Sequence, residues 1–458
     1  MVNNNLVRHF FVSLILSTLP TMTTFEELND NLENLLTHLD SIRDTVPMTV
    51  LLLAPYREKT NKKFEEFIEE NVNKIDEDDK DGLSVSLPYD LAKLYEQLSK
   101  NTVISNLAPL IITESLFVSL ISQYDSFLNK LLRILYKIQP SYINNSERQL
   151  TFSQLNNFET LDEAREYIVE KEIETVLRKS HTEHFEYLEN KIGISLRKDL
   201  PVWKKFIEIT ERRNLLVHCD GKVSNQYIKV CNDHKCDIKS IKVNDRLSVS
   251  VEYFSQAYNC LYELSTKLTH TIWRKLLKES LEKADEELNN ICFELLTAQR
   301  FDLADIILDF GYKQTKHYND ASKNYFIVNK ALSKFLQKDY KQAKEIINKK
   351  DWSATSEDFK LAHLIINEKL DEAYELMKKI GNNGEVTKEH YKYWPLFYHL
   401  RKSKKFKTNF LEIFNEEYSV LEIPKRPIQE IIDELIEKNP EIKEKAIQKD
   451  SKKTNPAQ

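Results

Sequence analysis

The chain has 458 residues, of which 30% are charged and only 6 are Gly, and its formal net charge is −6. This length exceeds what one hydrophobic core usually supports, so we expect two or three domains. The composition predicts an all-α fold, and so few glycines disfavour glycine-rich phosphate loops and dinucleotide-binding folds. The negative net charge excludes a uniformly basic nucleic-acid surface and leaves room only for a local basic patch.

The N-terminus contains an apolar run, FFVSLILSTL, between residues 10 and 19. It resembles the core of a signal peptide, but Pro20 follows it and no small-residue cleavage site appears. The run is also too short to span a bilayer. Thr24 and Glu27 have capping-box spacing after Met22. We therefore expect translation to start at Met22, so that residues 1–21 are not made; a signal or membrane anchor is the alternative.

The predicted elements up to residue 280 are helices. Residues 1–90 form an N-terminal helical segment, in which 23–75 predict two helices followed by an acidic linker, DEDDKDG, at 76–82. Residues 91–280 predict a helical bundle with helices over 103–138, 161–191, from Pro201 onward, and over 247–277. The helix over 103–138 is the most apolar, and it carries a stripe of small residues that favours close helix packing: Ser115, Ser119, Ser122 and Ser126.

A repeated pattern follows the bundle, over residues 281–424. A polar turn, an Ala and an apolar pair recur around Ala304, Ala343 and Ala373. The pattern resembles degenerate tetratricopeptide-like helical hairpins, which implies a concave surface for a protein or peptide partner. A non-repeating helical domain is the alternative. Residues 425–458 read as a charged, Pro-punctuated tail.

The stretch ERRNLLVHCDG, residues 211–221, carries the candidate chemistry. Asn214 and His218 are four residues apart and share one helical face, and Arg213 is close enough to reach the same space. Gly221 predicts the helix end, and the pattern predicts that Leu215–Val217 are buried. Between residues 197 and 246 twelve Lys or Arg stand against seven Asp or Glu, which predicts a local basic patch around this stretch.

These residues resemble the signature of the HEPN superfamily, all-α ribonucleases whose motif is an Arg, a polar residue, several variable positions and a His. SLFVSLISQYDSFLNKLLRILYKI resembles the first long helix of that bundle, with Asp125 as its acidic residue. The resemblance covers roughly residues 100–275. It implies that Arg213 and His218 are catalytic with Asn214 as the polar residue, that Asp125 supports them, and that two copies pair into a homodimer. Many members act in toxin–antitoxin or abortive-infection defence.

The residue chemistry is consistent with this assignment. RNA supplies its own nucleophile, the ribose 2′-OH, so cleavage needs a proton acceptor, a proton donor and a cation beside the phosphorane. His218 can move protons near neutral pH, and Arg213 can hold two phosphate oxygens. No metal or other cofactor is required. Alternatively, Arg213 pairs with Glu208 or Glu211 and His218 has no reaction to perform.

Two other clusters suggest metal ligands. Cys231, His234 and Cys236 lie close together but lack a second pair of cysteines, so we expect an exposed polar loop rather than a zinc site. His181 and His184 lack a third ligand in register and are expected on a solvated face. Five cysteines, an odd number, are typical of a reduced compartment, so we expect a cytoplasmic protein without a disulfide framework or a membrane partner.

The sequence thus predicts a metal-independent endoribonuclease, an effector of toxin or antiviral defence. The alternative is a non-catalytic HEPN-like scaffold that binds RNA or proteins.

Overall fold

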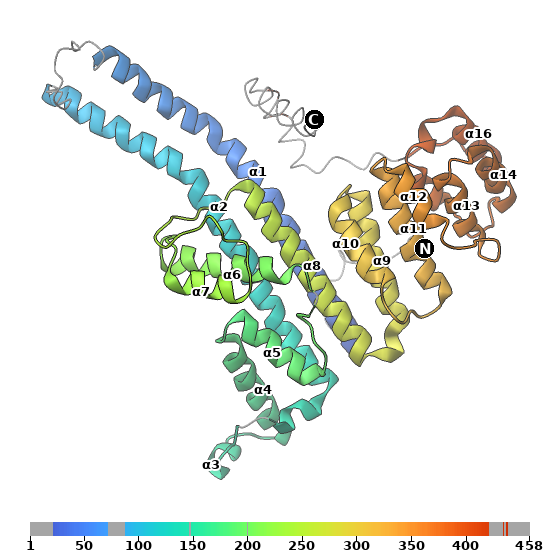
Figure 1. Cartoon of the computed structure of the whole chain (residues 1–458), viewed down its shortest axis with the longest axis horizontal. Helices are drawn as coiled ribbons and strands as arrows, with labels where there is room; N and C mark the ends of the chain where they lie inside the picture. Colours follow the sequence, from blue (N-terminus) through green and yellow to red (C-terminus); the bar gives the residue numbers. More distant parts are fainter. Residues whose placement is uncertain are drawn as a thin grey trace. The chain divides into compact units, whose positions relative to one another are not determined.

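The computed structural model describes residues 22–71, 88–145, 148–198 and 200–420, together with Glu434 and Glu437. Within these ranges the regular elements are helices, apart from one isolated antiparallel bridge between Lys222 and Arg246 (Figure 1). The predicted all-α fold class is confirmed. The expectations for residues 1–21 and 76–82, and those for 425–458 apart from the two glutamates, lie outside the described residues.

The chain divides into two compact units, each built from segments that are distant in sequence. We call the first the motif unit; its described residues in the body of the chain are 34–71, 88–127 and 200–262. We call the second the repeat unit; its described residues are 22–33, 128–145, 148–198 and 263–420. Three helices, α1 (Thr24–Asn71), α2 (Tyr89–Ile138) and α8 (Val251–Leu276), contribute residues to both units.

In the motif unit, α1 and α2 lie antiparallel (Figure 1). The Thr60 hydroxyl donates a hydrogen bond to Ser105 Oγ at 2.8 Å, and Asn106 Nδ2 donates to Asn61 Oδ1 at 3.1 Å. The prediction of two helices over 23–75 is wrong, because a single α1 runs through Pro47 and Pro55. By length and composition, α2 is apolar enough to cross a membrane, a test that the core helix of a soluble protein can also pass.

The start of α1 corrects a predicted cap. Thr23, not Thr24, precedes the helix, and its backbone N–H and its hydroxyl both donate to Glu26 Oε2, at 2.8 and 2.7 Å. Glu27 instead forms an ion pair with Lys137 at 2.7 Å, within the repeat unit. The predicted cap therefore lay one residue too late.

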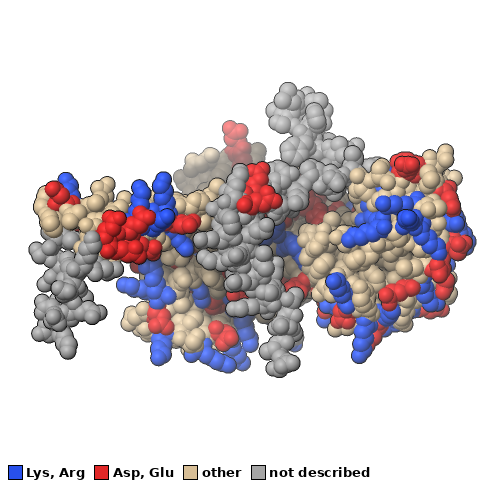
Figure 2. Space-filling view, turned by 90° about the horizontal axis from the view of Figure 1, so that it is seen from above, with Lys and Arg blue, Asp and Glu red and all other residues tan. Residues whose placement is uncertain are grey.

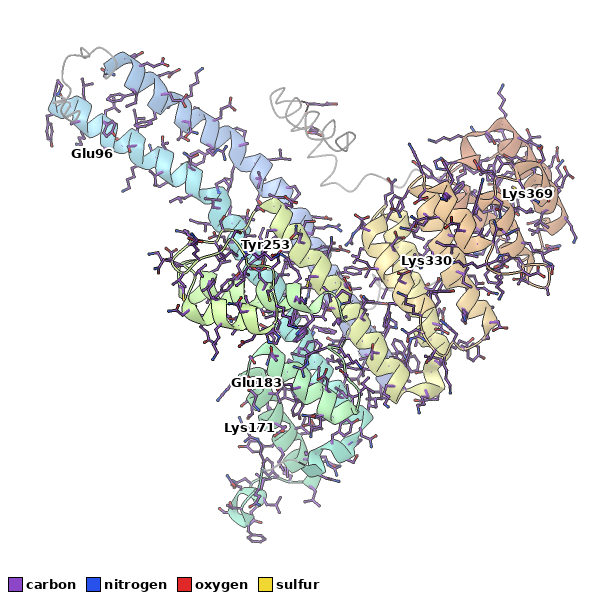
Figure 3. All side chains as sticks on the ribbon, in the orientation of Figure 1. Glu96, Lys171, Glu183, Tyr253, Lys330 and Lys369 are labelled. Atoms are coloured by element: carbon purple, nitrogen blue, oxygen red, sulfur yellow. The ribbon has the colours of Figure 1, made fainter. Side chains whose placement is uncertain are left out.

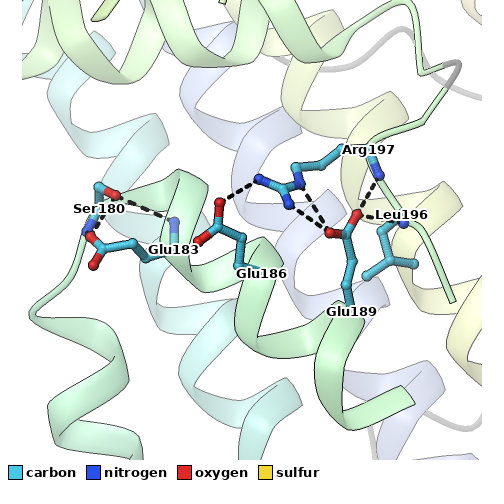
Figure 4. Close-up of polar contacts among 6 residues, drawn as sticks. All are labelled: Ser180, Glu183, Glu186, Glu189, Leu196 and Arg197. Carbon is cyan, nitrogen blue, oxygen red and sulfur yellow. Dashed lines mark hydrogen bonds and ion pairs between the residues drawn. The ribbon is translucent and has the colours of Figure 1, made fainter. Parts of the chain in front are cut away.

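The repeat unit contains eleven α-helices in addition to its parts of α1, α2 and α8, counted over the described residues. Their bounds are α3 (Phe152–Leu155), α4 (Leu161–Leu177), α5 (His181–Ile192), α9 (Leu281–Thr297), α10 (Phe301–Tyr312), α11 (Asp320–Leu336), α12 (Tyr340–Ile347), α13 (Glu357–Ile366), α14 (Leu370–Ile380), α15 (Lys388–Tyr393) and α16 (Lys404–Phe414). The single helix predicted over 161–191 is in fact α4 and α5. A new helix begins after Ser180, because the Ser180 hydroxyl accepts from the Glu183 backbone and Glu183 accepts in return (Figure 4).

Three helix pairs in this unit, α9–α10, α11–α12 and α13–α14, share one turn geometry. Two residues after the end of each first helix comes a non-glycine residue in the left-handed conformation: Gln299, Lys338 and Glu368. The backbone N–H of the next residue then donates to the carbonyl five positions earlier, at 2.8 to 2.9 Å. Five residues after each left-handed residue comes a fully buried alanine of the second helix: Ala304, Ala343 and Ala373. The alanines singled out by the sequence therefore occupy equivalent places.

Candidate functional site

The candidate stretch lies on α6 (Trp203–His218), in the motif unit. Trp203, Phe206 and Ile207 are buried as the sequence predicts, and Pro201 lies in the turn just before the helix. Of the three aliphatic residues predicted to be buried, only Leu215 is, at 2% exposure. Leu216 is half-buried and Val217 is 48% exposed, so that prediction is wrong for Val217.

The helix ends at His218 because the chain reverses immediately afterwards. The Leu215 carbonyl accepts from the backbone N–H of both Cys219 and Gly221, at 2.8 and 3.0 Å. Gly221 has φ +71°, and a Cβ there would lie 2.7 Å from the Leu247 carbonyl oxygen. Glycine is thus required both by its conformation and by a close backbone approach. The predicted helix end at this glycine is confirmed.

A small core supports the end of α6. The segment after Gly221 forms α7 (Asn225–Asp233) and returns so that Lys222 pairs with Arg246. The buried residues of this small core are Leu215, Val223, Tyr227, Cys231 and Ile238. Since Leu215 belongs to α6, this core ties the last turns of that helix to α7.

Arg213 faces α2. Its Nη2 donates to Asp125 Oδ2 at 2.8 Å, with side-chain exposures of 21% for the arginine and 36% for the aspartate. Arg213 Nε is buried and has no hydrogen-bond partner in the described structure. Two residues that the sequence could relate only through a family resemblance are therefore in contact. Glu208, which the sequence offered as an alternative partner of Arg213, instead binds Arg212 and Lys205.

Asn214 and His218 lie on a different side of the helix from Arg213. At about 100° per residue, His218 projects about 40° from Asn214 and about 140° from Arg213. His218 is exposed and Asn214 is half-buried, and among the described residues neither forms a hydrogen bond or an ion pair. The sequence predicted that Arg213 would reach the same space as Asn214 and His218. Within one chain this is wrong for Arg213, because only Asn214 and His218 share a helical face.

A buried network lies beside these residues, and sequence reasoning did not find it. Glu208, 5% exposed, binds Arg212 Nη2 at 2.8 Å and accepts hydrogen bonds from the hydroxyls of Tyr227 at 2.9 Å and Tyr253 at 2.6 Å. Tyr253 comes from the first turn of α8 (Figure 3), and the Arg212 guanidinium lies 3.9 Å from the centre of its ring. Burial, and then the Glu208 charge, raise the pKa of both tyrosines, so both hydroxyls stay protonated and donate.

A second ionisable residue near the end of α6 also escaped the sequence analysis. Glu114 on α2 is close enough to Arg246 and Asp220 to respond to their charges. Partial burial is the main cause of its raised pKa; Arg246 opposes the shift and Asp220 adds to it. Asp220 and Arg246 themselves form an ion pair at 3.3 Å. A carboxyl group with a raised pKa thus lies near the turn that follows His218.

The predicted basic patch carries less unpaired positive charge than its number of Lys and Arg residues suggests. Five of its members have carboxylate partners: Arg197, Lys205, Arg212, Arg213 and Arg246. Arg197, for example, binds both Glu186 and Glu189 (Figure 4). The remaining lysines of this window are exposed: Lys198, Lys204, Lys222, Lys229, Lys235, Lys239 and Lys242. In the face shown in Figure 2, basic and acidic side chains are interspersed over the described residues.

In both candidate metal clusters, one residue that was expected to be exposed is buried. Cys231 is fully buried in the small core, so the prediction of an exposed polar loop is wrong for it. The His234 ring packs edge-on against Trp203, with ring centroids 6.1 Å apart. His184 is 3% exposed, so a solvated face is wrong for it as well. Among the described residues, no three His, Cys, Asp or Glu side chains are grouped so that they could hold a metal ion.

Comparison with known proteins gives no match: no family model, no curated protein and no solved structure matches the chain.

Proposed function

We propose that the protein is a metal-independent endoribonuclease of HEPN type, an effector in toxin or antiviral defence. The observation that carries this proposal is the Arg213–Asp125 ion pair, at 2.8 Å, on the same helix whose exposed end presents His218. The pair fixes a guanidinium against α2, and His218 is an accessible imidazole, the side chain that most often transfers protons in catalysis.

The proposed reaction is attack by the ribose 2′-OH on the adjacent phosphorus. A base takes the 2′-OH proton, O2′ bonds to phosphorus, the P–O5′ bond breaks, and an acid protonates O5′. The products are a 2′,3′-cyclic phosphate and a 5′-OH. We assign proton transfer to His218 and stabilisation of the phosphorane charge to Arg213. Asn214, which shares the His218 face, would orient the bound RNA, and Asp125 would position Arg213.

Because Arg213 and His218 project from different sides of α6, one chain alone is a poor fit to a phosphate that both must contact. A second copy could bring a further His218 to the phosphate, which supports the proposed homodimer. An exposed apolar stripe on α2 is also consistent with dimerisation, and its members are Val103, Ile104, Leu107, Leu110 and Ile111. Three serines of the predicted stripe are exposed as well, and Ser119 is half-buried.

A protein or peptide partner on the repeat unit is a further part of the proposal. A cavity of about 750 Å³ there is lined by side chains of α10, α11 and α12. Its charges are mixed, and four of the eight charged side chains are paired: Lys330 (Figure 3) binds Asp309, and Lys334 binds Asp305. Such a cavity suits an extended polar segment better than an apolar helix.

The alternative function is a non-catalytic scaffold. The observation that favours it is the same Arg213–Asp125 pair, which also serves as a structural tie between α2 and α6 with no substrate involved. On that reading, the exposed lysines of the motif unit bind RNA without cleaving it, or the two units bind proteins.

The test is single-turnover cleavage of total RNA by the full chain, with and without EDTA, followed by analysis of the product ends. We expect EDTA-resistant cleavage that yields 2′,3′-cyclic phosphates. His218→Ala should lower the rate on the order of a hundredfold or more, and His38→Ala, which removes an exposed helical histidine elsewhere, should not. Expression should harm a bacterial host unless His218 is replaced. RNA binding without cleavage would favour the scaffold, and products ending in 3′-OH would exclude this mechanism.

A further inference from the structure

The chain leaves α7 through a turn that brings two cysteines together. The Cys236 backbone N–H donates to the Cys231 carbonyl at 2.8 Å, and the Lys235 N–H donates to the Asn232 carbonyl at 3.0 Å. Lys235, between them, has a left-handed φ of 54°. This is the hydrogen-bond pattern of a Schellman motif, in which the side chain after the left-handed residue packs against the side chain five positions earlier. Here both of those side chains are cysteines.

The backbone geometry of this turn suits a disulfide. The hydrogen bond from the Cys236 N–H to the Cys231 carbonyl brings the two backbones close together, and disulfides need Cα atoms about 4.4–6.8 Å apart. Both residues belong to one small core, in which Cys231 is buried and Cys236 packs against it. Both are free thiols. The turn thus brings two free thiols together without a change in the course of the backbone.

The two thiols differ in accessibility and acidity. Cys231 is fully buried, whereas Cys236 is half-buried and its thiol lies 3.2 Å from the Lys204 carbonyl, to which it donates. Contact with the Cys231 thiol lowers the pKa of Cys236, and contact with Cys236 raises the pKa of Cys231. Because oxidants react with the thiolate, Cys236 is the thiol that reacts first and Cys231 is the one that resolves the product.

We propose that Cys231 and Cys236 form a reversible oxidation site, which closes to a disulfide within the chain when the protein meets hydrogen peroxide. The Cys236 thiolate attacks a peroxide oxygen, the O–O bond breaks, and a sulfenic acid and hydroxide result. The Cys231 sulfur then attacks the sulfenic sulfur, the S–S bond forms, and the sulfenic oxygen leaves as water together with the Cys231 proton. The two thiols supply two electrons, and one peroxide becomes two waters. A dithiol reductant reverses the reaction.

Oxidation at this position acts on α6. The disulfide removes the thiol hydrogen that Cys236 donates to Lys204, a residue of the first turn of that helix. It also cross-links a core that contains Leu215, the residue after Asn214. The chemistry of the site is independent of the proposed ribonuclease activity, so either proposal can fail without the other.

The experiment uses the full chain, reduced, freed of reductant and treated with hydrogen peroxide. We expect the number of free thiols to fall from five to three and to recover with dithiothreitol. Trypsin cleaves after Lys229, Lys235 and Lys239, so the two cysteines fall on separate peptides, VCNDHK and CDIK. A mass equal to the two peptides minus two hydrogens identifies the cross-link directly. Five remaining thiols, or a cross-link that includes Cys219, would overturn the proposal.

Three serine variants test the assigned order. In Cys231→Ser, peroxide should leave a sulfenic acid on Cys236 that dimedone traps, with no disulfide. In Cys236→Ser, Cys231 should react at least about tenfold more slowly, because it is buried and protonated. Cys219→Ser, which removes the exposed cysteine, should leave the cross-link unchanged. Alkylation rates of Cys231 and Cys236 in the unmodified protein give the same comparison without any substitution, and equal rates would contradict the order.

Discussion

Arg212 and Arg213 are adjacent in the sequence and bind carboxylates in different places. Arg212 Nη2 lies 2.8 Å from Glu208 Oε1, on α6 itself, and Arg213 Nη2 lies 2.8 Å from Asp125 Oδ2, on α2. Glu208 is almost fully buried, whereas the Asp125 side chain is 36% exposed. One arginine therefore belongs to an internal network and the other to a site that a ligand can approach, so that substitutions can separate the two roles.

We predict that Arg213→Lys lowers the RNA cleavage rate nearly as much as Arg213→Ala, on the order of a hundredfold, because an ammonium cannot hold two phosphate oxygens in a fixed fork. Single-turnover kinetics measure the effect, and Arg165→Lys, at an exposed arginine of α4 that pairs with an aspartate, is the matched control. A lysine variant with wild-type kinetics would show that a positive charge alone is sufficient.

Glu208→Gln should destabilise the motif unit by about 3 kcal/mol, because it leaves Arg212 partly buried without a carboxylate. Urea unfolding followed by circular dichroism gives the loss. Glu252→Gln, at an exposed glutamate on the first turn of α8, should change stability by less than about 0.5 kcal/mol. Equal stabilities of the two variants would mean that the network contributes little.

Gly221→Ala and Gly193→Ala form a matched pair. Both glycines have φ near +70°, but a Cβ at Gly193 meets nothing within 4 Å, whereas one at Gly221 lies 2.7 Å from the Leu247 carbonyl. We expect Gly193→Ala to cost about 1 kcal/mol from backbone strain alone, and Gly221→Ala to cost a further 1–3 kcal/mol or so. Only Gly221→Ala should also reduce cleavage, since the end of α6 must shift. Similar unfolding midpoints would argue against the clash.

His270, on α8 within the repeat unit, predicts a pH dependence of stability. It is fully buried, neither ring nitrogen has a hydrogen-bond partner among the described residues, and burial with a contribution from Arg274 lowers its pKa to about 3. The unfolded chain therefore binds a proton between pH 6.5 and 3 that the folded chain does not. This contribution to stability is fully present above about pH 7 and is lost as the pH falls, by about 1.4 kcal/mol at pH 5.5.

Replacement of His270 by Phe should remove this component, so that the difference in unfolding midpoint between pH 7.5 and 5.5 becomes smaller than in the wild type. His38→Gln, at an exposed position, should leave the difference unchanged. An unaltered pH dependence in the phenylalanine variant would show that other groups determine it.

Dimerisation through α2 is the last prediction. Leu107 and Ile111 are 45% and 57% exposed and lie one turn apart on the apolar stripe. The double substitution Leu107→Asp and Ile111→Asp should convert a dimer into a monomer, because it places two charges on the buried surface. Light scattering at micromolar concentration measures the mass, and Leu411→Asp, at a leucine of similar exposure on α16, is the control. A monomeric wild-type protein would contradict the prediction outright.

Local signals in the sequence were sufficient for the main features of α6. Its end before Gly221 depends on residues within the helix or next to it and was predicted correctly, whereas its start was predicted at Pro201 and lies two residues later, at Trp203. The exposure of Val217 was not, because an aliphatic residue near a helix end is buried only if another element covers that side. The two helices predicted over 23–75 are one helix that contains Pro47 and Pro55, since a proline weakens a helix without always ending it.

Contacts between distant residues were harder to foresee. Glu208 and Arg212 stand four apart, so their pairing could have been read from helical spacing, but the tyrosines that complete the network are 19 and 45 residues away from Glu208. Asp125 and Arg213 are 88 residues apart, and only a family resemblance linked them before the fold was known. Spacing along the chain contains no information about such pairs, because the packing of separate helices decides them.

The pattern of helix–helix contacts in the repeat unit determines how this part of the protein unfolds. From α9 to α14, each helix touches mainly the helices next to it in sequence, and α14 then touches α16. Removing one pair therefore takes contacts from its immediate neighbours and leaves the more distant pairs intact. Stress applied at the α14–α16 end should loosen the region one helix pair at a time, in contrast to the all-or-none melting of a single core.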